Sequence, residues 1–292
     1  MIPKEIIKKI KRIHIKSRRT ANTLMAGQYK SVFRGSGIEF EEVRSYCPGD
    51  DVKAIDWKVS ARLGKPFIKL YKEERESIVM LLIDMSSSQM FGTFSGLKLE
   101  KAAEIASVLA FNAIKNNDKV GVIFFTDKVE KYIPPKKGSS HIWHLIKEIF
   151  TFTPKEKGTN IACALDFLAN VSRKKTVSFI ISDFIADQYI KNLKIVKQRH
   201  EIIGIVLYDK GDFYLPEKGI ISIACFETGK TIVLDAFYKK TRKYYENQTK
   251  KQYNQSLNNL KKSSVDFIEI GTHMSVSNTL SKYFRYRERK IK

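Results

Sequence analysis

Residues 78–83 place the strongest constraint on this chain, because six apolar residues in a row are followed at once by polar ones. A run of that length suits a central parallel strand that is buried on both faces of its sheet. Such a strand would deliver Asp84, Ser86 and Ser88 to its carboxyl end, in the pattern D-x-S-x-S. Ligands of open α/β sheets bind beyond the carboxyl ends of the strands, so this turn is a candidate binding site.

The chain after this run alternates between strand-like and helix-like patterns. Strands are predicted near 120–125, 129–133, 176–181, 201–208 and 265–270, and helices near 97–116, 139–150, 161 onward, 187–198 and 275–289. Strands separated by helix-length segments predict an α/β fold, with a mostly parallel sheet and helices on both faces. We expect this domain to span 76–292, with a hairpin and a long helix inserted at about 211–263.

The first 75 residues have a different character, and we expect a separate unit at 1–75. Residues 4–25 show a helical apolar stripe with Lys and Arg between its members. In 27–75, Gly and Pro separate β-like pieces at 38–44, 53–57 and 67–71, which predicts a small antiparallel module with Trp57 and Phe67 as its core. Asp50, Asp51 and Asp56 are expected to cap turns or to pair with basic neighbours.

The formal charge of +22 is concentrated at the two ends of the chain. Residues 1–30 carry a net charge of +8 and residues 239–292 carry +10, which leaves +4 for the 208 residues between them. Basic ends favour an anionic partner, and solvated helix faces are the plainer alternative. The stripe at 4–25 would suit an anionic membrane, or it would pack on the body of the protein.

Two further polar positions belong with the D-x-S-x-S turn. Asp183 follows the predicted strand at 176–181, and Thr159 lies in the loop before the helix near 161. A parallel sheet would bring these residues together with Asp84, Ser86 and Ser88. Three hydroxyls and two carboxylates suit one Mg²⁺ or Mn²⁺ ion, bound directly by the hydroxyls and through water by the acids. An open coordination position would accept a carboxylate of a partner.

At these residues the sequence resembles a von Willebrand factor type A domain with a metal-ion-dependent adhesion site. The stretch at 31–76, SVFRGSGIEFEEVRSYCPGDDVKAIDWKVSARLGKPFIKLYKEERE, resembles more specifically the bacterial domain-of-unknown-function family fifty-eight. The resemblance covers about residues 24–292 and departs at Cys47, where a polar residue is expected. It implies the ligand set Asp84, Ser86, Ser88, Thr159 and Asp183. It also implies a MoxR-type AAA+ ATPase as partner, with other von Willebrand type A proteins as further candidates, in the assembly or maturation of another complex.

Enzymatic motifs are missing, so we expect a binding module and not an enzyme. The turn lacks the D-x-D of haloacid dehalogenase phosphatases, and the chain has no G-x-S-x-G elbow and no P-loop. His141 and His144 are expected to be surface or packing residues.

Three distant cysteines and a charged N-terminus favour the cytoplasm, with the inner face of the membrane as the alternative location. A basic membrane-bound or nucleic-acid-binding protein is the alternative function, and of these nucleic acid is the less favoured partner.

Overall fold

The computed structural model describes residues 4–21, 37–74, 76–93, 96–186, 188–217, 219–224 and 231–291. The chain forms two compact units, one made of Met1–Val32 with Ser77–Lys292 and the other of Phe33–Glu76. The N-terminal helix therefore belongs with the large unit, whereas the sequence grouped it with the small β module.

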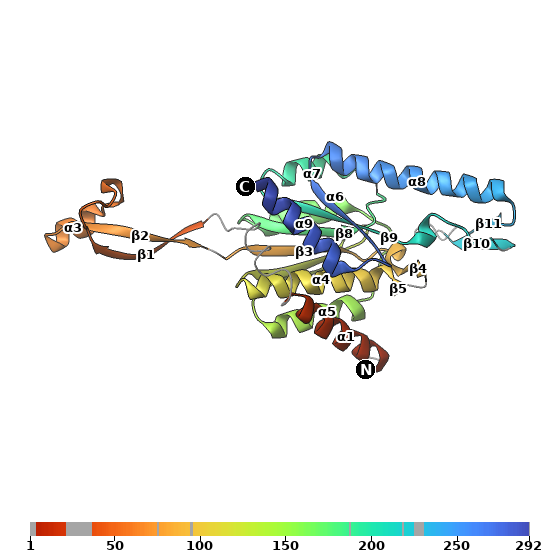
Figure 1. The fold of residues 1–292 in the computed structure, drawn as a ribbon, viewed down its shortest axis with the longest axis horizontal. Helices are drawn as coiled ribbons and strands as arrows, with labels where there is room; N and C mark the ends of the chain where they lie inside the picture. The colour runs from red at the N-terminus through yellow and green to blue at the C-terminus, as the bar shows by residue number, and fades with distance from the viewer. Residues whose placement is uncertain are drawn as a thin grey trace. The chain divides into compact units, whose positions relative to one another are not determined.

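A six-stranded sheet forms the centre of the large unit (Figure 1). Its strands are β3 (Ile78–Asp84), β6 (Lys119–Phe125), β7 (Val129–Lys136), β8 (Thr176–Ser182), β9 (Glu201–Tyr208) and β12 (Asp266–Gly271). Their order is β12-β9-β8-β3-β6-β7, and β7 alone among them pairs antiparallel. Counted along the chain this is the order 3-2-1-4-5-6 of doubly wound sheets, which confirms the predicted fold class.

Helices cover both faces of the sheet. One face carries α4 (Lys98–Lys115), α5 (Ser139–Thr151) and α9 (Val276–Ile291), and the other carries α6 (Ile161–Val171), α7 (Ile190–Val196) and α8 (Lys239–Lys262). Met80 and Leu82 of β3 share one buried cluster with residues of α6, α7 and α8. Because successive side chains of a strand point to opposite faces, their neighbours in β3 point toward α4. Burial on both faces explains the unbroken apolar run.

The N-terminal helix α1 (Lys4–Thr20) packs against α4 and α5. Ile10 is buried, and the ammonium groups of Lys9 and Lys16 pair with Glu100 and Glu104 of α4 at 2.5 Å and 2.6 Å. Part of the predicted apolar stripe is therefore used in packing on the body of the protein. Residues 22–25 of the predicted helix lie outside the described residues.

The predicted insertion before the last strand is a hairpin followed by a long helix. The hairpin consists of β10 (Ile220–Ala224) and β11 (Thr231–Asp235), and α8 follows it. Short elements that the sequence did not predict lie near the carboxyl edge of the sheet. They are η3 (Ser87–Met90), β4 (Gly92–Thr93), β5 (Gly96–Leu97) and η4 (Lys210–Asp212).

The small unit is an antiparallel pair, β1 (Gly37–Ser45) with β2 (Phe67–Glu74), linked through η2 (Val52–Ala54) and α3 (Trp57–Leu63). The prediction of a strand at 53–57 was wrong, and so was that of Trp57 as core. Trp57 begins α3 and is 69% exposed, whereas Ile68 is buried. The acids act as expected, because Asp50 pairs with Arg44 while Asp51 and Asp56 cap η2 and α3.

Candidate functional site

The carboxyl ends of β3 and β8 bring two acids to one corner of the sheet. Asp84 is the last residue of β3, Asp183 directly follows β8, and the two strands are parallel neighbours. Both residues are buried, at 0% and 3% exposure. The Asp84 carboxylate accepts a hydrogen bond from Ser182 Oγ at 2.6 Å, which ties the two strand ends together.

The D-x-S-x-S turn folds back over this corner. Ser86 donates its backbone N–H to Asp84 Oδ1 at 2.9 Å, and the Oγ atoms of Ser86 and Ser88 lie 3.0 Å apart. Mg²⁺ holds oxygen ligands at about 2.1 Å in an octahedron, so adjacent ligand atoms are about 3 Å apart. The two hydroxyls hydrogen-bond to each other, and their separation also equals one edge of a magnesium coordination shell.

The loop that carries Thr159 lies beside this turn. Ser87 donates its N–H to the carbonyl of Lys157 at 3.0 Å, and Asn160 donates its N–H to the carbonyl of Thr126 at 2.8 Å. Thr159 is half-buried between these two anchors. The structure thus brings Asp84, Ser86, Ser88 and Asp183 together and fixes the loop of Thr159 next to them.

The buried carboxylates of Asp84 and Asp183 bring more negative charge to this corner than the nearby positive charge balances. Burial, together with the nearby charge of Asp183, raises the pKa of Asp84 to about 7. The hydrogen bonds from Ser182 and Ser86 act in the opposite direction but do not cancel these two effects. A cation held between the carboxylates would favour their ionised forms. The hydroxyl spacing and this excess of buried carboxylate both fit the predicted divalent ion.

Three charged residues near this corner were missed by the sequence analysis. The Lys98 side chain is 3% exposed, and its ammonium lies 3.4 Å from Asp183 Oδ2 and 3.1 Å from Asp212 Oδ2. Asp209 follows β9 and is fully buried, with Thr93, Thr272 and the backbone of Gly211 donating to it. Asp209 could have been predicted, because it directly follows a buried strand as Asp183 does. The sequence gives no sign that Lys98 is buried, because a lysine in the first turn of a helix normally faces solvent.

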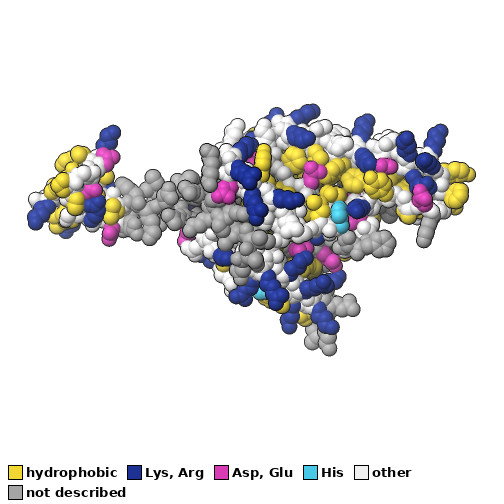
Figure 2. All heavy atoms as spheres, in the orientation of Figure 1, with side chains coloured by type: hydrophobic (Ala, Val, Ile, Leu, Met, Phe, Trp, Pro, Cys, Tyr) yellow, Lys and Arg dark blue, Asp and Glu magenta, His cyan; other side chains and the backbone are white. Residues whose placement is uncertain are grey.

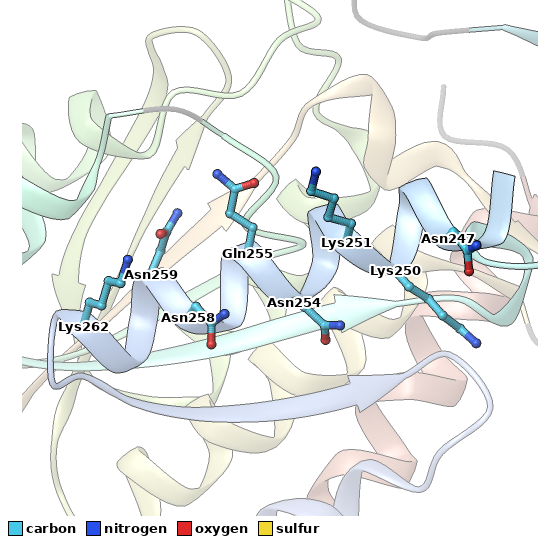
Figure 3. A pocket seen from close by; sticks show the side chains of 8 residues that line it. All are labelled: Asn247, Lys250, Lys251, Asn254, Gln255, Asn258, Asn259 and Lys262. Carbon is cyan, nitrogen blue, oxygen red and sulfur yellow. The ribbon is translucent and has the colours of Figure 1, made fainter. Parts of the chain in front are cut away.

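Other candidate groups do not form a second centre in the described part of the chain. His141 is buried and its Nε2 contacts the carbonyl of Val120 at 2.8 Å, as expected for a packing residue. Within the described ranges, no three His, Cys, Asp or Glu side chains cluster as a metal site would require. A polar pocket of about 610 Å³ runs along α8 (Figure 3). Asn, Gln and Lys side chains line it, from Asn247 to Lys262.

The fold and the corner define a class: a Rossmann-like α/β domain with an oxygen-rich turn at the carboxyl edge of its sheet. The chain belongs to the family described as "Protein of unknown function DUF58", whose model matches residues 42–255. That family is the one the resemblance indicated.

Known relatives are similar over most of the chain. The uncharacterized protein Mb1516 of Mycobacterium bovis is 29% identical over 209 residues, which are 70% of this chain and 66% of Mb1516. The match thus spans slightly less than two thirds of that relative. Among solved structures, an aerotolerance-related membrane protein from Bacteroides fragilis is 19% identical, with a TM-score of 0.45. BatB from Bacteroides thetaiotaomicron is 15% identical, also at 0.45, and each match covers 73% of this chain and 99% of the other.

Proposed function

We propose that this protein is a non-enzymatic interaction module that binds an acidic residue of a partner through one Mg²⁺ or Mn²⁺ ion. The observation that carries the proposal is the pair of Ser86 and Ser88 hydroxyls, which lie 3.0 Å apart in the turn whose Ser86 N–H donates to the buried Asp84 carboxylate. Hydroxyl and carboxylate oxygens are the ligand types that such ions prefer.

Each residue of the site has a distinct role in this proposal. Ser86, Ser88 and Thr159 would hold the ion through their hydroxyls, whereas Asp84 and Asp183 would hold its bound waters and balance its charge. Ser182 orients the Asp84 carboxylate by donating to Oδ2. A bound ion supplies an open coordination position, which a carboxylate of the partner would fill.

The resemblance to MoxR-associated proteins supports a partner within the same proposal, and the three distant cysteines support a location. The partner system would include a MoxR-type AAA+ ATPase, and the complex would act in the cytoplasm in assembly or maturation of another protein. Among the residues that the structure describes, no helix is both long and apolar enough to cross a bilayer.

Replacement of Ser86 by Ala is expected to weaken Mn²⁺ binding by about tenfold or more, because it removes a ligand oxygen from a preformed shell. Calorimetric titration with Mn²⁺ and with Mg²⁺ measures this change. Ser178→Ala is the matched control, since Ser178 is equally buried on β8 but hydrogen-bonds to Thr176 at the other end of the strand. Equal affinities of wild type, Ser86→Ala and Ser178→Ala would contradict the assignment.

A second candidate function is contact with an anionic membrane, and the hairpin region favours it. Five apolar side chains there are between 58% and 76% exposed (Figure 2): Ile220, Ile232, Val233, Phe237 and Tyr238. Lys239, Lys240 and Lys243 follow them in the first turns of α8. Exposed aromatic residues beside lysines are typical of surfaces that lie on anionic lipid. The stripe of α1, which the sequence offered for this role, is partly used in packing.

Vesicle sedimentation tests this second candidate. We expect more protein to sediment with vesicles containing phosphatidylserine than with phosphatidylcholine alone, and the combined change Phe237→Ser and Tyr238→Ser should remove most of that difference. Tyr286→Ser is the control, because Tyr286 is 65% exposed on the separate helix α9. Equal sedimentation of the hairpin variant and wild type would count against the hairpin as the contact surface.

A further inference from the structure

Lys98 is a buried cation in contact with a carboxylate of the candidate metal site. Its ammonium lies 3.4 Å from Asp183 Oδ2 and 3.1 Å from Asp212 Oδ2, and 5.9 Å from the centre of the Phe91 ring. A lysine that is 3% exposed is rare in proteins and requires paired negative charge. The carboxylates of Asp183 and Asp212, both within 3.4 Å of the ammonium, supply that negative charge. The side chain therefore carries its positive charge inside the protein.

The two partners of Lys98 belong to different parts of the carboxyl edge. Asp183 follows β8 and is one of the proposed ligands, whereas Asp212 lies in η4, after β9. Asp212 is held in place, since its Oδ2 also accepts the backbone N–H of Asp209 at 2.7 Å. Asp209 is in turn fixed by Thr93 Oγ1 at 2.8 Å. Lys98 therefore has a rigid second carboxylate that takes no part in the proposed metal shell.

We propose that Lys98 competes with the divalent ion for Asp183 and so sets the metal affinity of the site. This inference rests on the proposed function. In the metal-free protein the ammonium neutralises Asp183. Two cations beside one carboxylate repel each other, so ion binding requires Lys98 to give up its contact with Asp183 and to keep only Asp212. Metal binding at the ends of β3 and β8 is thereby coupled to the turn after β9.

A purely structural lysine predicts a different pattern of variant effects. If Lys98 only held the corner together, its removal would loosen the site and weaken metal binding. If Lys98 competes with the ion, its removal strengthens binding, and removal of Asp212 weakens it because the ammonium then has Asp183 as its remaining partner. The effect of Asp212→Asn should also become much smaller once Lys98 is replaced, because the competitor is gone.

Calorimetric titration with Mn²⁺ alone, on Lys98→Met, Asp212→Asn and the double variant, tests the inference. We expect Lys98→Met to bind about tenfold more tightly than wild type, Asp212→Asn several-fold more weakly, and the double variant to resemble Lys98→Met. Lys101→Met is the control, because Lys101 lies one turn further along α4 and pairs with Glu104 at 3.3 Å. Lys98→Gln and the double variant keep the test valid if the excess buried charge of Lys98→Met prevents folding.

The possible outcomes distinguish the competition by Lys98 from the existence of the metal site. If Lys98→Met binds Mn²⁺ more tightly than wild type, the competition is supported. This holds even if wild type shows no Mn²⁺ binding. Equal or weaker binding by folded Lys98→Met and Lys98→Gln, with saturable binding by wild type, overturns the competition and leaves the metal site standing. No binding by wild type or by any folded Lys98 variant overturns both.

Discussion

Asp84→Asn is expected to lower Mn²⁺ affinity by at least about 100-fold while leaving the metal-free protein as stable as wild type, or more stable. The loss follows from removal of a carboxylate that balances the charge of the ion. The stability follows from the cost of a fully buried charge beside Asp183. An Asn side chain fits the same space, and its oxygen can still accept the N–H of Ser86. Calorimetry measures the affinity, and urea unfolding measures the stability.

Asp209→Asn is the matched control for this experiment. Asp209 is also fully buried at a strand end, but its hydrogen bonds, led by that from Thr272, overcome burial and lower its pKa. Its ionised form therefore stabilises the fold, and we expect its loss to reduce the free energy of unfolding by about 1–3 kcal/mol. Asp209→Asn should therefore lower the free energy of unfolding, whereas Asp84→Asn should leave it unchanged or raise it. Full metal affinity in folded Asp84→Asn, or in Asp84→Ala, would refute the site.

The stability of the metal-free protein is expected to fall between about pH 4 and about pH 7 because of Asp84. Burial and Asp183 raise the pKa of Asp84 from 3.8 to about 7, so in this window the folded protein holds a proton that the unfolded chain has released. The stabilisation is complete below pH 4, is lost as the pH rises to about 7, and changes little above that. One pKa unit corresponds to about 1.4 kcal/mol, so the loss amounts to at most about 5 kcal/mol.

Urea unfolding at several pH values, with Asp84→Asn alongside, isolates this contribution. The difference in unfolding free energy between wild type and variant should change across the window. Saturating Mn²⁺ should flatten the wild-type profile, because the ion stabilises the ionised carboxylate. Parallel profiles of the two metal-free proteins would show that Asp84 titrates with an ordinary pKa.

Local patterns predicted most of the large unit because its central strands β3, β6 and β8 are buried on both faces and read as unbroken apolar runs. The apolar run of β3 and the polar residues that end it identified Asp84 and Ser86 as site candidates. The β7 strand was expected to stop at Pro134, yet it continues to Lys136. An edge strand tolerates proline, since one side of it carries no ladder hydrogen bonds.

The features that the sequence did not predict depend on packing between residues that are far apart in the chain. Lys98 looks like any basic residue of an exposed helical turn, and its burial depends on Asp183 and Asp212, which lie far along the chain. Trp57 was predicted, with Phe67, to form the core of the small unit. In a unit as small as Phe33–Glu76 there is little interior to fill, and Trp57 faces solvent at the start of α3. Composition does not reveal which apolar residue a small unit buries.

The bond between Ser182 and Asp84 joins residues that are 98 positions apart in the chain. Between them lie β6, β7 and three of the helices, so β3 and β8 can pair only after a large loop has closed. Pairings of such long range form late and slowly during folding. A ligand held by both strand ends would therefore recognise the finished sheet and ignore partly folded chains. Its binding energy would go entirely to the native state, and a nascent chain that ends before β8 would have no site to offer.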